Sequence, residues 1–216
     1  MLISLATLER PAVSSLCVGQ LWSTIQNRDD ARLHVYDDGS ANPALLAGVC
    51  HELHKCHRLG VDGQRVHQLR KFWESGHEYV YLTDDDVFHA PDWLDVGTSL
   101  ARTTGLPVSL YRTSFHPLAS GQCERGTAAG CSMLLHRDHV AVVMPRLHEL
   151  QHLWDIRVCQ MLPRWAFPPQ SYCEHLGAHG LHGDGSFDRD RADNPTPWLA
   201  SKRAGLIQTV AAGGTI

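Results

Sequence analysis

Short apolar segments alternate with segments of helical periodicity along the first half of this chain. Three apolar segments are each long enough for one buried strand: 1–7, 32–36 and 79–82. Three other segments carry apolar residues at helical spacing: 11–27, 42–57 and 64–75. Because strands that alternate with helices build parallel sheets, the pattern predicts an α/β domain with a largely parallel sheet.

The second half continues this pattern less regularly. Two segments have helical spacing and two more are strand candidates: 91–102 and 152–162, then 107–111 and 132–135. Asp, Arg, Asn and Pro dominate 184–197, which predicts a partly flexible tail. Trp198 and Leu199 predict that this tail packs back on the body. With 216 residues and no internal repeat or linker, we expect a single domain.

Composition argues against several classes of partner. The formal net charge is −4 and the chain has only three lysines, which disfavours non-specific binding to nucleic acid or to an anionic membrane. No apolar run approaches the roughly 20 residues that span a bilayer. The N-terminus lacks the basic stretch and cleavage site of a signal peptide. Seven cysteines without a secretory context predict reduced thiols, and we therefore expect a cytoplasmic protein.

Two of the predicted strands end in acidic clusters, Asp37-Asp38 and 84–86. Ligands of open α/β sheets bind beyond the carboxyl ends of the strands. Five carboxylates at one edge repel one another unless a cation or hydrogen-bond donors compensate, and hard divalent cations bind such oxygens and bridge to phosphates. The pattern predicts a metal-assisted site for a phosphorylated substrate. The alternative is that the aspartates cap the helices that follow.

Three segments resemble the GT-A fold glycosyltransferases of the large family-two type: T-L-E-R at 7–10, V-Y-D-D-G-S at 35–40 and Y-L-T-D-D-D-V at 81–87. The resemblance is clear over 1–94. It implies a GT-A (Rossmann-like) domain over 1–216, with a mixed, mostly parallel sheet flanked by helices. Residues 1–94 would bind the nucleotide sugar, 95–183 would border the acceptor, and 184–216 would form the tail. The implied activity is metal-dependent transfer of a sugar from a UDP- or GDP-sugar to a hydroxyl acceptor.

The resemblance also assigns residues to the donor. Thr7 and Arg10 would lie at the base and ribose, and Asp38 would contact the uracil or ribose with Asp37 beside it. Asp84 or Asp85 would meet the ribose or donor sugar. A loop at Gly63 departs from the family pattern, and the arginines that could reach the diphosphate there are Arg65 and Arg70. Their alternative is an exposed, solvated helix face.

A divalent Mn²⁺ or Mg²⁺ ion is implied at the triple aspartate. Asp86 matches the metal-binding position, and Asp84 shares its side of an extended strand because the strand period is two. S-Y-C-E-H-L-G at 171–177 resembles a late segment in which a histidine completes the metal site. His175 is the first choice, with His179 and His182 as substitutes.

Asp155 resembles the general base of inverting family members, because it begins a predicted helix. The alternative is a helix-start carboxylate that the helix dipole stabilises. If Asp155 is not the base, Glu149 and Glu174 are the next candidates. The segment 126–135 resembles the loop and strand that border the acceptor pocket, although an ordinary turn also explains Gly130.

Three other interpretations stay open. Cys50, His54 and His57 would share one face if 42–57 is a helix, and zinc binds such faces, but no second Cys/His pair has the expected spacing. A nucleotidyltransferase would also use a Rossmann-like sheet and carboxylates, yet 8–11 lacks the Gly-rich phosphate loop. A non-catalytic nucleotide- or sugar-binding module of the same fold is the third alternative.

Overall fold

The computed structural model describes residues 1–8, 11–42, 46–113, 124–176 and 192–211. Its main sheet has five strands in the order β3-β2-β1-β4-β7. Their bounds are Leu2–Thr7 (β1), Arg32–Asp37 (β2), Glu52–Lys55 (β3), Tyr79–Asp84 (β4) and Ser132–His136 (β7). The first four run parallel, and β7 is antiparallel to β4. The mixed, mostly parallel sheet is therefore confirmed.

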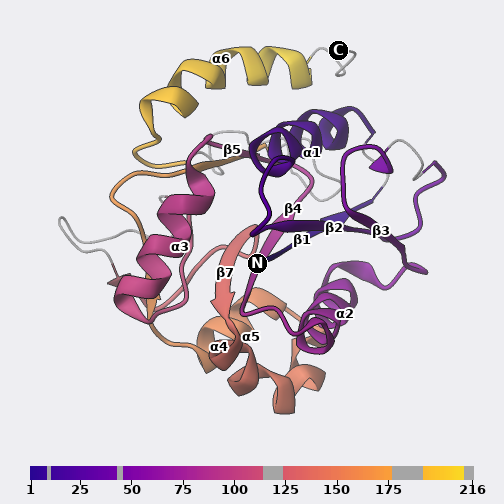
Figure 1. The fold of residues 1–216 in the computed structure, drawn as a ribbon, viewed down its shortest axis with the longest axis vertical. Helices are drawn as coiled ribbons and strands as arrows, with labels where there is room; N and C mark the ends of the chain where they lie inside the picture. Colours follow the sequence, from indigo (N-terminus) through magenta and orange to yellow (C-terminus); the bar gives the residue numbers. More distant parts are fainter. Residues whose placement is uncertain (9–10, 43–45, 114–123, 177–191, 212–216) are drawn as a thin grey trace.

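Helices cover both faces of this sheet (Figure 1). One face packs on α1 (Pro11–Ile25) and α3 (Trp93–Thr104), and the other on α2, α4, η2 and α5. The last four span Gly60–Ser75, Arg137–Val143, Met144–Gln151 and Trp154–Met161. Strand β1 is buried along its whole length because Ile3 and Leu5 face the α1 side while Leu2 faces the α2 side. Removing this apolar surface from water on both faces is the main stabilising contribution to the domain.

Two short strand pairs lie outside the central run of five strands. The strand β5 (Val87–His89) directly follows the triple aspartate and pairs antiparallel with β9 (Cys173–His175), with Val87 opposite His175. Strands β6 (Glu124–Arg125) and β8 (Trp165–Ala166) form another short pair. The strand expected at 107–111 is reduced to bridges from Val108 to Leu134 and Ala166.

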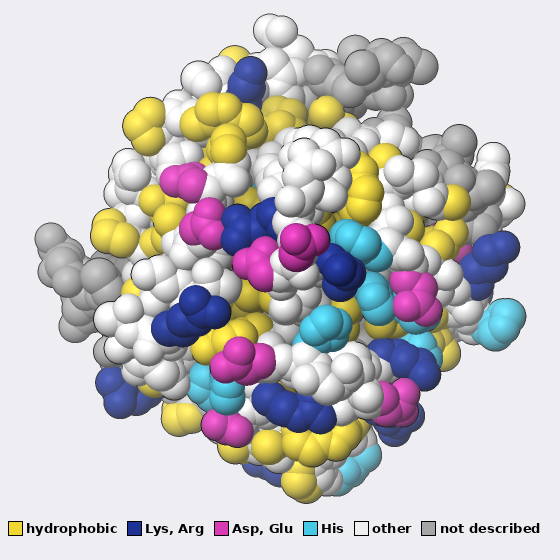
Figure 2. All heavy atoms as spheres, in the orientation of Figure 1, with side chains coloured by type: hydrophobic (Ala, Val, Ile, Leu, Met, Phe, Trp, Pro, Cys, Tyr) yellow, Lys and Arg dark blue, Asp and Glu magenta, His cyan; other side chains and the backbone are white. Residues whose placement is uncertain are grey.

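The helix expected at 42–57 is wrong, because Glu52–Lys55 is the strand β3. His34 of β2 pairs with Glu52, and Tyr36 pairs with His54, so backbone hydrogen bonds to a neighbouring strand decide the conformation. The helix face proposed for zinc therefore does not exist. Figure 2 shows histidine side chains gathered on this part of the surface.

The tail packs on the body as its aromatic and apolar residues predict. Leu199 is fully buried in helix α6 (Pro197–Ala211), and Trp198 stacks on Phe88 with ring centroids 5.6 Å apart. Of the segment expected to be flexible, 184–191 lies outside the described residues. Its remainder is held by bridges from Thr113 to Ala192 and from Ser171 to Pro195. Among the helices that the structure describes, none is long and apolar enough to cross a membrane.

Candidate functional site

The carboxyl ends of three parallel strands meet at one edge of the sheet. Thr7 at the end of β1 lies opposite Asp37 at the end of β2. On the other side of β1, Ala6 lies opposite Asp84 at the end of β4. The sheet register therefore brings both acidic clusters to the same edge, as the alternating pattern predicts. Arg10, which was expected beside Thr7, lies outside the described residues.

Asp84 is held by a buried arginine. Arg65 is 0% exposed, donates from Nη2 to Asp84, and donates from Nη1 to the Thr83 carbonyl at 3.1 Å and to Gln68 Oε1 at 2.7 Å. The exposed-face alternative is therefore wrong for Arg65 and fits only Arg70, whose side chain is exposed. Three acceptors around one guanidinium favour a role in positioning Asp84 over direct contact with a diphosphate.

Asp85 points into the protein. It is 0% exposed, and its Oδ2 accepts hydrogen bonds from Thr7 Oγ1 at 2.6 Å and from Ser14 Oγ. These bonds connect the turn after β4 to the end of β1 and to α1. Thr7 and Asp85 are thus brought together, in a hydrogen-bonded pair beneath the edge. Ser14 was missed by the sequence reasoning, since nothing distinguishes it from other small residues on an amphipathic helix.

Asp86 and His175 are brought together by the β5–β9 pair. His175 Nε2 lies 3.3 Å from Asp86 Oδ1, and the Asp86 carbonyl accepts from the Leu176 N–H at 2.8 Å. The Asp86 side chain is 6% exposed and that of His175 is 21% exposed. One carboxylate and one imidazole at this separation are a donor set that fits Mn²⁺, with further oxygens from substrate phosphates. His179 and His182 lie outside the described residues.

Asp38 and Asp37 have different partners. Asp38 accepts from the backbone N–H groups of Leu59 at 2.7 Å and Gly60 at 2.8 Å, so it caps the start of α2. Asp37 Oδ2 accepts from the N–H groups of Gly39 and Ser40, at 3.3 and 3.0 Å. Asp37 Oδ1 is buried and has no hydrogen-bond partner among the described residues. Asp37 therefore has the spare acceptor, and the capping interpretation fits Asp38.

Asp155 is the second residue of α5 and is half-buried. Its Oδ1 accepts from the Ile156 N–H at 2.8 Å, and it lies in the first turn of the helix, where the helix dipole favours a carboxylate. The preceding Trp154 lies over Arg65, with 5.0 Å from the guanidinium carbon to the ring centroid. A Cβ on Gly130 would lie 2.6 Å from Trp154 Cζ2 and 3.0 Å from Asp155 Cβ, so the 126–135 segment touches the start of α5 directly.

Glu149 and Glu174, the next candidates for the general base, each form an ion pair that gives the residue a structural role. Glu149 is paired with Arg146 at 2.7 Å. Glu174 accepts from Arg203 at 2.5 Å and from the Ala192 N–H at 3.2 Å, so it holds α6 and the chain before it. These contacts leave Asp155 as the stronger candidate of the three.

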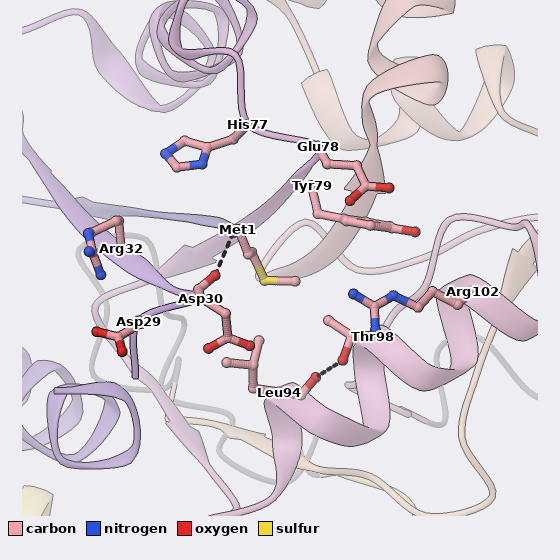
Figure 3. A pocket seen from close by; sticks show the side chains of 10 residues that line it. All are labelled: Met1, Asp29, Asp30, Arg32, His77, Glu78, Tyr79, Leu94, Thr98 and Arg102. Carbon is pink, nitrogen blue, oxygen red and sulfur yellow. Dashed lines mark hydrogen bonds between the residues drawn. The ribbon is translucent and has the colours of Figure 1, made fainter. Parts of the chain in front are cut away.

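A separate pocket of about 390 Å³ lies at the other end of the parallel strands, where their amino ends meet (Figure 3). Its lining includes Met1, Arg32 and Tyr79, which stand at the amino ends of β1, β2 and β4. Ligands of open α/β sheets bind at the carboxyl ends, so this pocket is not the candidate site.

Solved structures share this fold. No protein-family model matches the sequence, and no curated protein does so either. Mannosyltransferase PcManGT from Pyrobaculum calidifontis, in complex with GDP-Man and Mn²⁺, matches with a TM-score of 0.60 and 16% identity, over 100% of this chain and 76% of that one. TarS 1–349 from S. aureus matches with a TM-score of 0.60 and 11% identity, over 82% of this chain.

The match with TarS covers only part of that protein. This chain spans 60% of TarS 1–349 and 36% of the longer TarS structure. TarS 1–349 in complex with UDP-GlcNAc matches with a TM-score of 0.55 and 12% identity. At these identities the likeness establishes the fold alone. The chain has the α/β fold of GT-A-type nucleotide-sugar glycosyltransferases, with its acidic clusters at the carboxyl ends of the strands.

Proposed function

We propose that this protein is a glycosyltransferase that moves a sugar from a nucleoside diphosphate sugar to a hydroxyl acceptor. The observation that carries the proposal is the meeting of Asp86 and His175, 3.3 Å apart, at the edge where β1, β2 and β4 end. The pair includes the last residue of one acidic cluster, and the strand register brings the other cluster, Asp37-Asp38, to the same side of the sheet. A structural cap would need no histidine from a distant strand.

The donor is a UDP- or GDP-sugar. TarS 1–349 is known in complex with UDP-GlcNAc and with UDP, and PcManGT in complex with GDP-Man, so the fold accommodates both bases. Asp37 is the residue best placed to accept from the nucleotide, because its Oδ1 is buried without a partner among the described residues. Asp38, Thr7 and Asp85 shape the surrounding loop through the hydrogen bonds described above.

Asp86 and His175 would hold a Mn²⁺ or Mg²⁺ ion, with Asp84 beside them. When bound, such an ion neutralises the diphosphate and stabilises the departing nucleoside diphosphate. Arg65 orients the Asp84 carboxylate, since its guanidinium donates to that carboxylate from a buried position.

Asp155 is the proposed general base. Its carboxylate takes the proton from the acceptor hydroxyl as the oxygen attacks the anomeric carbon, and the bond from that carbon to the phosphate oxygen breaks. Attack from the face opposite the leaving group inverts the anomeric centre. Trp154 fixes the start of α5 against Arg65, and thereby fixes the position of Asp155 relative to the donor.

The test is a panel of UDP- and GDP-sugars incubated with the protein, with and without Mn²⁺, while release of nucleoside diphosphate is measured. We expect release with at least one donor and a strong metal dependence. Asp155→Asn should bind that donor normally but transfer more slowly, by a factor on the order of 10²–10⁴. Arg70→Gln is the matched control on the exposed face of α2.

Three outcomes would overturn the proposal. Binding of a donor without turnover on any acceptor would leave a non-catalytic binding module. Release of pyrophosphate from a nucleoside triphosphate would indicate a nucleotidyltransferase. If no nucleoside diphosphate raises the melting temperature with Mn²⁺ present, the donor site is assigned wrongly, because a ligand of the folded state stabilises it by mass action.

A further inference from the structure

A second group of metal-ligating side chains lies on β2 and on the outermost strand of the sheet, β3, and includes none of the aspartates at the strand ends. His34 comes from β2, and Glu52 and His54 come from the edge strand β3. One ligand atom from each lies within 4.8 Å of the others. The part of the chain that the structure describes offers no other such group of three.

The strand register explains why these side chains converge. His34 lies opposite Glu52, and Tyr36 lies opposite His54, in a parallel pair. Because side chains alternate across a strand, residues two apart share a face, so all four project from the same face of the sheet. Tyr36 is fully buried and its ring stacks on His54, with centroids 4.3 Å apart and planes 11° from parallel. This stacking fixes the plane of the His54 ring before any ligand arrives.

The distances match those between ligands of one small cation. His54 Nε2 lies 3.2 Å from His34 Nδ1. The Glu52 carboxylate oxygens lie 3.6 Å from His34 Nδ1 and 3.5 Å from His54 Nε2. Ligands of a tetrahedral Zn²⁺ ion at about 2.0–2.1 Å from the metal lie about 3.3–3.4 Å from one another. The two Glu52 distances involve different oxygens, Oε2 toward His34 and Oε1 toward His54, so a rotation of this exposed carboxylate is what brings one oxygen into the third position of a tetrahedral set.

The charge state also suits a cation. Burial lowers the pKa of His34 to about 4 and lowers the pKa of His54, although Glu52 opposes both shifts. The neutral imidazole, which these shifts favour, is the form that offers a lone pair to a metal ion. Each histidine side chain is 18% exposed, while that of Glu52 is 55% exposed, so the group is open to solvent on one side.

We propose that His34, Glu52 and His54 form a binding site for one divalent transition-metal ion of the Zn²⁺ class. The fourth position, on the open side, is left for water. Two imidazoles and one carboxylate are a typical three-residue zinc set, whereas Mn²⁺ and Mg²⁺ prefer oxygen ligands. The site is separate from Asp86 and His175 and does not depend on the proposed transfer activity. A bound ion would link the outermost strand β3 to β2 through their side chains and so stabilise the pairing of the two strands.

The experiment titrates ZnCl₂ into chelator-treated protein, with calorimetry for affinity and the visible spectrum of Co²⁺ for coordination geometry. We expect one ion per chain at this site and a tetrahedral Co²⁺ spectrum. His34→Ala and His54→Ala should each weaken binding by about tenfold or more. His57→Ala, which removes an exposed histidine three residues away, is the matched control and should bind as the wild type does. Asp86→Asn should also keep this site, which separates it from the proposed donor site.

Wild-type affinity in both histidine variants would overturn the proposal, and so would a Co²⁺ spectrum unchanged by them. If a histidine variant fails to fold, Glu52→Gln decides, because it changes an exposed side chain and removes one ligand charge. Anomalous diffraction from crystals grown with ZnCl₂ gives an independent answer. A peak among the three side chains supports the site, and peaks only elsewhere refute it.

Discussion

The guanidinium carbon of Arg65 lies 5.0 Å from the centroid of the Trp154 ring, and the same guanidinium donates to Asp84. Arg65 belongs to α2, Asp84 ends β4, and Trp154 is the first residue of α5. One buried cation thus connects the triple aspartate with the helix that carries Asp155. The segment proposed to bind the donor and the segment proposed to border the acceptor share this contact.

Replacing Arg65 tests that connection. Arg65→Gln removes the guanidinium from Asp84 and removes the cation–π contact with Trp154. We expect the free energy of unfolding to fall by at most about 3 kcal/mol, since Asp84 is partly exposed. Nucleotide affinity in the presence of Mn²⁺ should fall as well. Chemical denaturation and calorimetry measure the two effects. Arg70→Gln, on the exposed side of α2, should change stability by less than about 0.5 kcal/mol. Unchanged stability in Arg65→Gln would contradict the contact.

His175→Ala separates the proposed metal ligand from a structural histidine. Because His175 Nε2 lies 3.3 Å from Asp86, its loss should weaken Mn²⁺-dependent nucleotide binding by about tenfold or more. Calorimetry with Mn²⁺ and either UDP or GDP measures it. His152→Ala, at an exposed position, serves as control. Wild-type metal dependence in His175→Ala would move the assignment to His179 or His182.

The strand ends of the candidate site could be predicted from sequence because their signals are local. An apolar run followed at once by Asp37-Asp38 or by the triple aspartate needs no knowledge of the rest of the chain. The α/β pattern predicts that the carboxyl ends of parallel strands meet, and the register of β1 and β2 then puts Thr7 opposite Asp37. The helices α1, after β1, and α2, after β3, were predicted from apolar residues at helical spacing, which is also a local signal.

What sequence could not give depends on contacts between distant residues. The spacing of Cys50, His54 and His57 resembles a helix face, but pairing with β2 makes 52–55 a strand. A charged residue is exposed by default, and only the packing of Asp84 and Trp154 explains why Arg65 is buried. The loop geometry also decides which carboxylate oxygens of Asp37 and Asp38 already accept hydrogen bonds from the backbone, and sequence alone does not show this.

Asp37 and Asp38 should respond differently to substitution. Asp38→Asn weakens the cap on α2, so we expect the free energy of unfolding to fall by about 1 kcal/mol with little change in nucleotide affinity. Asp37→Asn should instead weaken nucleotide binding, by a free energy on the order of 1.5–3 kcal/mol for a lost charged hydrogen bond. Thermal melting and nucleotide titration of both variants give the comparison. The assignment is reversed if Asp38→Asn shows the larger loss of affinity.

Stability should fall in mild acid because buried histidines stay neutral. Burial lowers the pKa of His89 to about 3, and Tyr81 Oη lies 3.0 Å from its Nε2. Above the unfolded pKa of about 6.5 both states are neutral and the residue contributes no pH dependence. Below it only the unfolded chain takes up the proton, so the free energy of unfolding falls until the pH reaches the folded pKa. Each such histidine contributes at most about 1.4 kcal/mol per pH unit.

Urea denaturation between pH 7 and pH 4 measures this slope. His89→Gln should flatten the slope relative to the wild type, whatever its effect at pH 7. His57→Gln removes an exposed imidazole and should keep a steeper slope than His89→Gln. Equal slopes in the two variants would show that His89 is not a source of the acid sensitivity.

Gly130 has room for no side chain. A Cβ there would stand 2.6 Å from Trp154 Cζ2 and 3.0 Å from Asp155 Cβ. Because Trp154 is itself buried against Arg65, the ring has no easy way to move aside. We expect Gly130→Ala to lower the free energy of unfolding by about 1–3 kcal/mol through overpacking. Denaturant midpoints at constant slope measure the change.

The same substitution also tests whether the start of α5 matters for transfer. Displacing Asp155 should slow transfer more than it weakens donor binding, because the proposed base acts only on the acceptor hydroxyl. Gly19→Ala is the matched control. Among the described residues nothing lies within 4 Å of a Cβ at Gly19 in α1, and alanine there should stabilise the helix by about 0.5–1 kcal/mol. Equal donor affinity with normal transfer in Gly130→Ala would mean that the position of Asp155 does not control the reaction.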